Sequence, residues 1–219
     1  MIVPYSRTSR GGFTLVELIT VVSVIVVLFA LVAGAYSYAD QSSKRSRTEV
    51  TIRVIRSALE NYREKFGSYP TPANPETSVT IADKTYVAGE AACLYQALSG
   101  DGFNQIKGVD SNQGSPDSNG QVEDAEAANV TLADMPREIW TVNSSSYFMI
   151  DGFGHPIRYI KALPTIAADG GQPPDPVTIN NTYDIWSYGN DTENLTATGF
   201  MTQDNTTLAR ASSKWIKNW

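Results

Sequence analysis

The feature that most constrains this chain is an apolar run near its start, at residues 13–36. Its 24 residues are enough for a helix to cross a hydrocarbon core about 30 Å thick. A secretory signal peptide has a shorter apolar core, and its small-residue cleavage site follows that core. Here the small pair Gly11 and Gly12 precedes the run, so we expect a membrane-spanning helix that stays in the mature protein. Glu17, Thr20, Ser23 and Gly34 interrupt the run.

Glu17 is the one acidic residue within this apolar run. An acidic side chain at the centre of a bilayer costs about 2.5–3.5 kcal/mol on insertion scales, so such residues usually have a partner or a task. One interpretation places Glu17 near the interface, where it reaches lipid headgroups. The other gives its carboxylate a function in assembly.

The residues G-F-T-L-V-E-L-I at 12–19 resemble the leader junction of type IV prepilins. The resemblance rests on Gly12 before the junction, Phe13 after it, and Glu17 at the fifth position of the mature chain. It implies that a prepilin peptidase cuts after Gly12 and methylates the amino group of Phe13. It also implies that Glu17 pairs with the α-amino group of Phe13 on a neighbouring subunit, which is largely cationic at neutral pH.

Residues 37–66 predict an amphipathic continuation of the helix. No proline interrupts residues 13–66, and Gly67 and Pro70 supply a stop. We expect one continuous helix, with two helices hinged near Gly34 as the alternative. Apolar residues recur at steps of three and four along one face, at Ile52, Ile55, Leu59, Tyr62 and Phe66.

Residues 67–219 predict a globular α+β domain. Its strands predict a small antiparallel sheet with one face against the long N-terminal helix, in a pilin-like arrangement. A loop-rich insertion is expected at residues 99–146, and its acidic first part, 99–126, is expected to be solvated. The expected elements are a hairpin over 78–88, a short helix over 90–98, and strands over 147–151, 157–162 and 183–188.

Two motifs in this domain narrow the resemblance. D-G-F-G-H-P-I-R-Y at 151–159 and Y-D-I-W-S-Y-G-N-D at 183–191 are similar to segments of the major pseudopilin of type II secretion systems, and Lys217, Asn218 and Trp219 resemble its C-terminal end. The resemblance implies a structural subunit that polymerises into a periplasmic pseudopilus. Its implied partners are copies of itself, the prepilin peptidase, minor pseudopilins, the inner-membrane assembly platform and membrane lipid.

The same resemblance implies a calcium site in the loop after the last strand. Asp191 matches the first acidic position, and Asp204 and Asn205 match the later pair. Calcium accepts six to eight oxygen ligands, including loop carbonyls. The extra residues 192–203 and the amide of Asn205 depart from the family pattern. A loop closed by hydrogen bonds alone is the alternative.

Charge and composition exclude several classes of function. Residues 1–66 hold nine Lys/Arg and five Asp/Glu, so +4, whereas residues 67–219 hold eight Lys/Arg and eighteen Asp/Glu, so −10. An acidic body is a poor nucleic-acid binder. The single cysteine, Cys93, excludes an intrachain disulfide and is expected to be buried or inert, while the single histidine, His155, is expected in a turn. We therefore expect no enzyme.

Two other functions stay open. The first is a true or minor type IV pilin for adhesion, motility or DNA uptake. The second, of another class, is a single-pass anchored binding module or enzyme. The charges that flank the apolar run do not fix its orientation, since Arg7 and Arg10 precede it and Lys44, Arg45 and Arg47 follow it. The resemblance, rather than the charges, implies a bacterial inner-membrane protein with its C-terminal domain in the periplasm.

Overall fold

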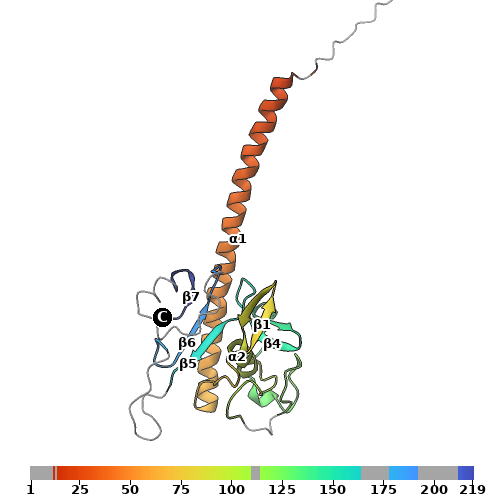
Figure 1. Ribbon diagram of the computed structural model, residues 1–219. Helices are drawn as coiled ribbons and strands as arrows, with labels where there is room; N and C mark the ends of the chain where they lie inside the picture. Colours follow the sequence, from red (N-terminus) through yellow and green to blue (C-terminus); the bar gives the residue numbers. More distant parts are fainter. Residues whose placement is uncertain (1–11, 13, 110–113, 164–177, 192–211) are drawn as a thin grey trace, which may run out of the picture. The chain divides into compact units, whose positions relative to one another are not determined.

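A single long helix, α1 (Leu15–Phe66), dominates the N-terminal part of the chain (Figure 1). The computed structural model describes residues 12, 14–109, 114–163, 178–191 and 212–219. The 52 residues of α1 run without a break through Gly34, so one continuous helix is confirmed and the hinged alternative is wrong. The helix ends at Gly67, whose left-handed φ of 78° lets its N–H donate to the carbonyl of Arg63 at 2.8 Å.

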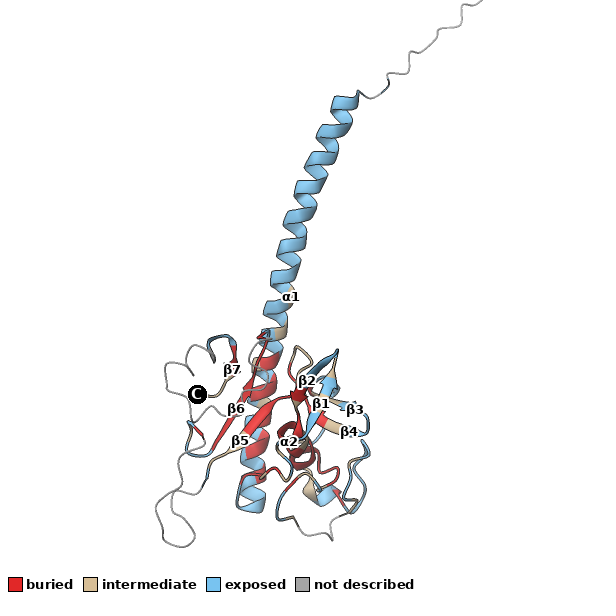
Figure 2. Ribbon diagram, viewed as in Figure 1, coloured by how far each residue is buried: buried red, intermediate tan, exposed pale blue. Residues whose placement is uncertain are grey.

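The chain divides into two compact units, Met1–Ser42 and Ser43–Trp219. In the first unit, every described side chain from Leu15 to Ala39 is exposed, as the pale blue of Figure 2 shows. This part of α1 has a mean hydropathy of 3.0 over its most apolar 18-residue window. It is long and apolar enough to cross a membrane, and no other helix among the described residues is.

The second unit contains a second α-helix, α2 (Gly89–Ser99), and three short antiparallel sheets among its described residues. The expected hairpin, the short helix and the three expected strands are all confirmed. The strand pairs are β1 (Ser78–Ile81) with β2 (Lys84–Val87), β3 (Trp140–Asn143) with β4 (Ser146–Met149), β5 (Arg158–Lys161) with β6 (Tyr183–Ser187), and β6 with β7 (Ile216–Lys217). Single-turn 3-10 helices are η1 (Ala127–Asn129), η2 (Arg137–Ile139) and η4 (Ser212–Lys214).

The expectation of a single small sheet is wrong, because two hairpins stand apart from the three-stranded sheet. Ala82 and Asp83 have φ values of 47° and 64°, and Ser144 and Ser145 have values of 47° and 70°. Two consecutive positive φ angles make the tight turn that closes a two-residue hairpin. α2 packs against both β4 and β5. A single antiparallel bridge between Ile150 and Pro156 links the residue that follows β4 to the segment that precedes β5, but the ladder does not continue into one sheet.

The core of the second unit joins the C-terminal half of α1 to α2 and the sheets. Ile55 and Leu59 of α1 are fully buried in one apolar cluster with Leu94 of α2 and Ile185 of β6 (Figure 2). The 3.6-residue period therefore identified the packed face of the helix. Phe66 is the exception, since it is 40% exposed and lies at the last residue of α1.

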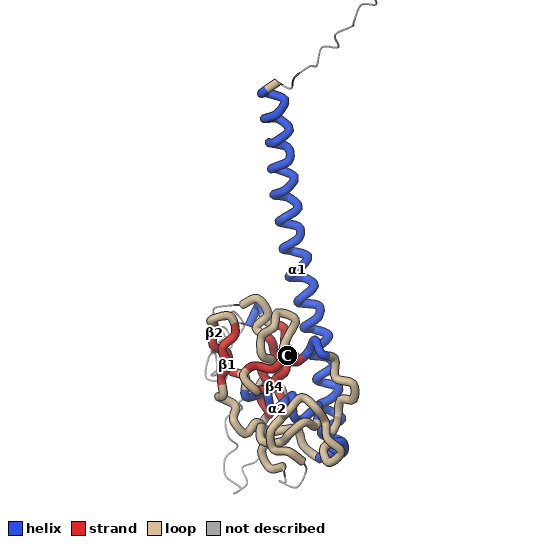
Figure 3. The backbone as a smooth tube through the Cα atoms, turned by 90° about the vertical axis from the view of Figure 1, so that its right-hand side faces the viewer, coloured by secondary structure: helices blue, strands red, loops and turns tan. Residues whose placement is uncertain are grey.

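The insertion at residues 99–146 is rich in loops, as expected, and Figure 3 shows how much of the second unit is drawn as loop. Two of its acids are nevertheless buried, so the expectation of a solvated loop is wrong for them. The carboxylate of Asp101 accepts hydrogen bonds from the Tyr95 hydroxyl at 2.8 Å and from the N–H groups of Asn119 and Gly120 at 2.9 and 2.8 Å. Glu126 likewise accepts two backbone N–H groups. Backbone N–H groups of the loop that have no partner in regular secondary structure donate to these carboxylates instead.

Candidate functional site

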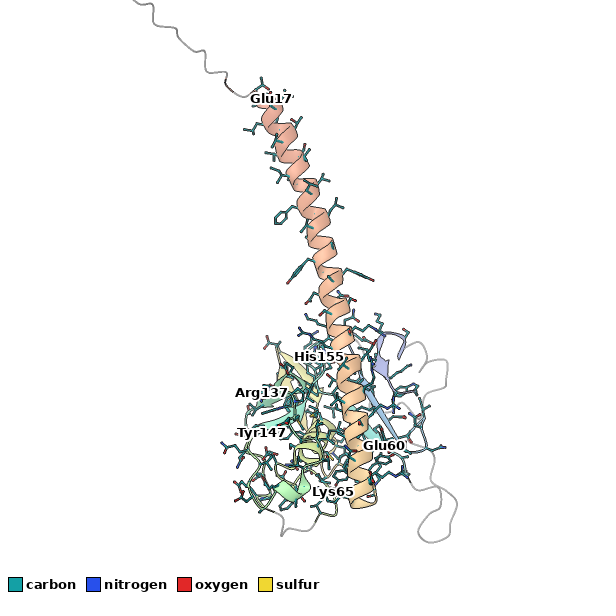
Figure 4. All side chains as sticks on the ribbon, turned by 180° about the vertical axis from the view of Figure 1, so that it is seen from behind. Glu17, Glu60, Lys65, Arg137, Tyr147 and His155 are labelled. Atoms are coloured by element: carbon teal, nitrogen blue, oxygen red, sulfur yellow. The ribbon has the colours of Figure 1, made fainter. Side chains whose placement is uncertain are left out.

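The first candidate site is the start of α1, where Thr14 and Glu17 form a capping box. The Thr14 N–H and hydroxyl both donate to Oε2 of Glu17, at 2.9 and 2.8 Å, and the Glu17 N–H donates to the Thr14 hydroxyl oxygen at 3.2 Å. Oε1 of Glu17 accepts no hydrogen bond from a described residue. Glu17 is exposed, as is Gly12, whereas Phe13 lies outside the described residues. Figure 4 labels Glu17 at the beginning of the helix.

The pattern T-x-x-E at 14–17 is typical of a capping box, but this box was not predicted from the sequence. The box directs the Glu17 carboxylate back towards the N-terminal end of α1, because its acceptor oxygen bonds the N–H of Thr14. Thr14, the second residue after the expected cleavage junction, therefore holds the acid that is expected to function in assembly. The local geometry is compatible with a second hydrogen-bond or ion-pair partner at Oε1.

The second candidate site is the turn at residues 151–156, which Asp151 organises. Its Oδ1 accepts the N–H groups of Phe153 and His155 at 2.8 and 2.9 Å, and its Oδ2 accepts the hydroxyl of Ser187 on β6. Burial raises the pKa of Asp151 above its ordinary value, although these donors oppose the shift. Asp151 therefore links the turn to β6 by hydrogen bonds.

Gly152 docks this turn on α1. Its N–H donates to the hydroxyl of the buried Thr48 at 3.0 Å. A Cβ atom at this position would lie 2.3 Å from the carbonyl oxygen of Lys44, which is closer than real Cβ contacts. The backbone of the turn can approach the helix this closely only if residue 152 has no side chain. Close packing therefore explains the glycine at this position of the motif.

The third candidate site is the expected calcium loop, of which the structure describes only the beginning. Asp191 is buried, and its Oδ2 accepts the indole N–H of Trp215 at 3.0 Å. Asp204 and Asn205 lie outside the described residues. Among the described residues, no group of three His, Cys, Asp or Glu side chains could hold a metal ion. One buried carboxylate is a fitting first ligand but does not make a site, so calcium binding stays a prediction that depends on residues 192–211.

Cys93 and His155 take structural positions. Cys93 is fully buried in α2, as expected, and burial raises the pKa of its thiol well above its usual range, which disfavours a reactive thiolate. His155 lies in the turn, as expected, and its ring stacks on Tyr86 with centroids 4.9 Å apart.

A buried ion pair between Arg158 and Glu90 was missed by sequence analysis. Arg158 Nε and Nη2 donate to the two carboxylate oxygens at 2.6 and 3.0 Å, and Nη1 donates to the Tyr188 hydroxyl at 2.7 Å. Burial opposes the charge on Arg158, but Glu90 outweighs it and raises the arginine pKa. No short-range pattern could have found the pair, because its members are 68 residues apart.

A cavity of about 360 Å³ lies in the second unit, between α2 and the β3–β4 hairpin. Its amide side chains bond one another, since Gln96 Nε2 donates to Asn104 Oδ1 at 2.8 Å. Asp117 is the one carboxylate among its lining residues, which include Tyr147 but no histidine or cysteine. The lining offers hydrogen bonds and an aromatic ring but no nucleophile beside a base.

Comparison with known proteins adds no relative. No protein-family model matches the chain, and no curated protein or solved structure matches it.

Proposed function

We propose that this chain is the precursor of a pseudopilin, cut after Gly12 by a prepilin peptidase and methylated at Phe13. The mature subunit is held in the bacterial inner membrane by α1 and polymerises with its C-terminal domain in the periplasm. The polymer is the pseudopilus of a type II secretion system, built with minor pseudopilins on the inner-membrane assembly platform. The subunit is structural and catalyses no reaction.

The observation that carries the proposal is the exposed apolar half of α1 with an acid at its first turn. An apolar helix without an apolar partner among the described residues needs lipid or other copies around it. Glu17 lies in the first turn of this helix, and its Oε1 has no partner among the described residues. Pairing with the cationic N-terminus of a neighbouring subunit would satisfy that oxygen in an apolar surrounding.

The charge on Glu17 can be tested apart from its role as a helix cap. Glu17→Gln keeps a side-chain oxygen for the capping box, because Gln serves at this position as well as Glu, but it removes the negative charge. We expect Glu17→Gln and Glu17→Val both to insert and to be processed, and both to reduce filament yield at least tenfold. Filaments sheared from cells and quantified by immunoblot give the yield, and mass spectrometry of the mature N-terminus checks processing.

The matched control is Thr20→Val, which alters a neighbouring polar residue of the same helix and leaves the cap and the charge in place. It should polymerise as the wild type does. Normal filament yield from Glu17→Gln would show that the charge has no function in assembly. A mature chain that begins anywhere other than at methylated Phe13 would contradict the proposed processing.

A true or minor type IV pilin is the alternative within the same class. The turn at 151–156 and the segment 183–191 favour secretion, because their sequences resemble those of pseudopilins, and the single cysteine cannot form the C-terminal disulfide that pilins often carry. Deleting the chain's gene separates the alternatives. Loss of exported protein from the medium supports a secretion subunit, and loss of adhesion or DNA uptake with normal export supports a pilin.

The cavity beside α2 is the one observation that favours an anchored binding module instead. Its volume of about 360 Å³ falls within the size range of small-ligand sites. A binding module would function as a single anchored copy, so its activity would survive Glu17→Gln.

A further inference from the structure

The solvent-exposed side of the C-terminal part of α1 is net basic. Between residues 43 and 66, all of which are described, the exposed cations outnumber the exposed acids Glu60 and Glu64. Arg45 pairs with Glu49 at 3.5 Å and Arg63 with Glu60 at 3.7 Å, whereas Arg53 and Arg56 lie one turn apart without such a pair in the described part of the chain. The exposed cations are Arg45, Arg47, Arg53, Arg56, Arg63 and Lys65.

Arg53 and Arg56 line a shallow groove of about 270 Å³, together with Ser57, Glu60 and Tyr183 of β6. Arg53 Nε donates to the backbone carbonyl of Glu49 at 3.3 Å. Among the described residues, neither Arg53 nor Arg56 forms an ion pair with a carboxylate. The carboxylate of Glu60 is already used, because it accepts the Tyr69 hydroxyl at 2.9 Å. The groove therefore presents two exposed guanidinium groups, and that of Arg56 interacts with the Tyr183 hydroxyl.

The insertion carries the opposite charge. In its described part, Lys107 and Arg137 are the exposed cations, and they are outnumbered by exposed acids. Glu123 and Asp124 are consecutive, and the turn that bears them is anchored, because the buried Glu126 accepts the Glu123 N–H at 3.1 Å. The exposed acids of the described insertion are Asp117, Glu123, Asp124, Asp134 and Glu138.

One copy of the second unit does not bring these surfaces together. Figure 4 labels Glu60 of the groove on one side of α1, and Arg137 of the insertion and Tyr147 of β4 on the other. No ion pair joins Arg53 or Arg56 to an acid of the insertion within the described chain. Two different surfaces of opposite charge, carried by the same chain, can pair only between copies. When copies repeat this contact head to tail, one surface stays free at each end and the assembly extends as a filament.

We propose that the groove at Arg53 and Arg56 binds the turn at Glu123 and Asp124 of the next copy of this chain. The inference rests on the proposed function and adds a contact in the periplasmic part of the polymer, in addition to the one made by Glu17. Two guanidinium groups a turn apart suit two adjacent carboxylates, because arginine donates in a planar fork. The insertion would thereby determine the relative orientation of successive subunits in the polymer.

The contact can be detected by crosslinking two full-length copies expressed together in cells that process and assemble the chain. One copy carries Ser57→Cys and the other, differently tagged, carries Ala125→Cys; both positions are exposed and flank the charged groups. Cys93 is fully buried, so it gives little background with a thiol crosslinker. We expect a crosslinked product that carries both tags.

Charge reversal then tests the pairing. Arg56→Glu in the Ser57→Cys copy should lower the crosslinked yield about fivefold or more, since one ion pair becomes a repulsion. Asp124→Arg in the Ala125→Cys copy should restore it. Lys107→Glu, which makes the same change of charge away from the groove, should leave the yield as it is. Trypsin resistance of each variant in membranes verifies that it is folded.

A second crosslinking pair separates this inference from the proposed function. Val27→Cys on both copies reports contact between the apolar parts of α1 in any polymer. If Val27→Cys crosslinks and the Ser57→Cys and Ala125→Cys pair does not, the groove contact is wrong and the polymer stands. If neither pair crosslinks, both proposals are wrong. A crosslinked yield that Arg56→Glu leaves unchanged also overturns the groove contact.

Discussion

At the scale of the residue, two side-chain properties position the turn at residues 151–156: the acceptor oxygens of Asp151 and the missing side chain of Gly152. Asp151 collects donors from its own turn and from β6, and Gly152 lets that turn reach the backbone of α1. The sequence pattern identified this segment as a turn, but not what the turn touches. Its partners, Thr48 and Ser187, are 104 and 36 residues away along the chain.

Gly152→Ala should destabilise the second unit by about 2 kcal/mol, because the new methyl group must push aside the Lys44 carbonyl. Gly154→Ala in the same turn is the contrast. It meets open space and bears only the strain of its φ of 83°, about 1 kcal/mol. Thermal unfolding of the full chain in detergent, followed by circular dichroism, measures both. Equal midpoints for the two variants would argue against the close packing of residue 152.

Sequence analysis was uneven at this scale. It placed Glu17 correctly within the apolar run and expected Cys93 to be buried, because both follow from polarity alone. It missed the capping box, although both Thr14 and Glu17 were visible. It judged Asp101 and Glu126 solvated, because composition cannot show that a carboxylate is surrounded by backbone N–H groups.

At the scale of the element, local periodicity predicted well. The helices and the three expected strands follow from repeats of 3.6 and 2 residues and from turn residues. The strands β3 and β7 were missed, because β3 lies in the segment interpreted as an insertion and β7 has only two residues. How the elements pair was predicted poorly, because a single sheet was expected and the described part of the chain forms three.

The Arg158–Glu90 pair fixes α2 on the three-stranded sheet and can be tested as a unit. Glu90→Gln leaves a buried guanidinium without its carboxylate, so we expect a loss of about 3–5 kcal/mol. The double variant Glu90→Leu with Arg158→Met removes both charges and should recover much of that loss. Chemical denaturation of the full chain measures the two differences. A double variant less stable than Glu90→Gln would mean that the pair itself, rather than the isolated charge, supplies the stability.

At the scale of the whole molecule, calcium is the factor that would couple the C-terminal segments. Calcium should raise the unfolding midpoint of the full chain by about 3 °C at ten times its dissociation constant, since a ligand of the folded state stabilises it by mass action. Asp191→Asn keeps an oxygen for the Trp215 indole but loses charge, so it should abolish the rise. Magnesium at equal concentration is the control. A midpoint that calcium leaves unchanged in the wild type would favour a loop closed by hydrogen bonds alone.

Charge was the best whole-molecule prediction from sequence. The basic N-terminal part and the acidic remainder are visible in a simple count of residues. The count could not show that six cations of α1 between residues 43 and 66 are exposed, or that two acids of the insertion are used internally. Those facts depend on which side of each element is buried, and burial is decided by distant parts of the chain.

The apolar half of α1 is exposed on every side, which also bears on where subunits are stored. Hydrocarbon chains and the helices of sister copies suit it about equally, whereas water does not. In the proposed polymer, a subunit that leaves a shrinking filament would return to the bilayer intact and be ready for reuse. The bilayer would then be a two-dimensional reservoir of subunits, and the rate of filament growth should depend on how densely it is filled.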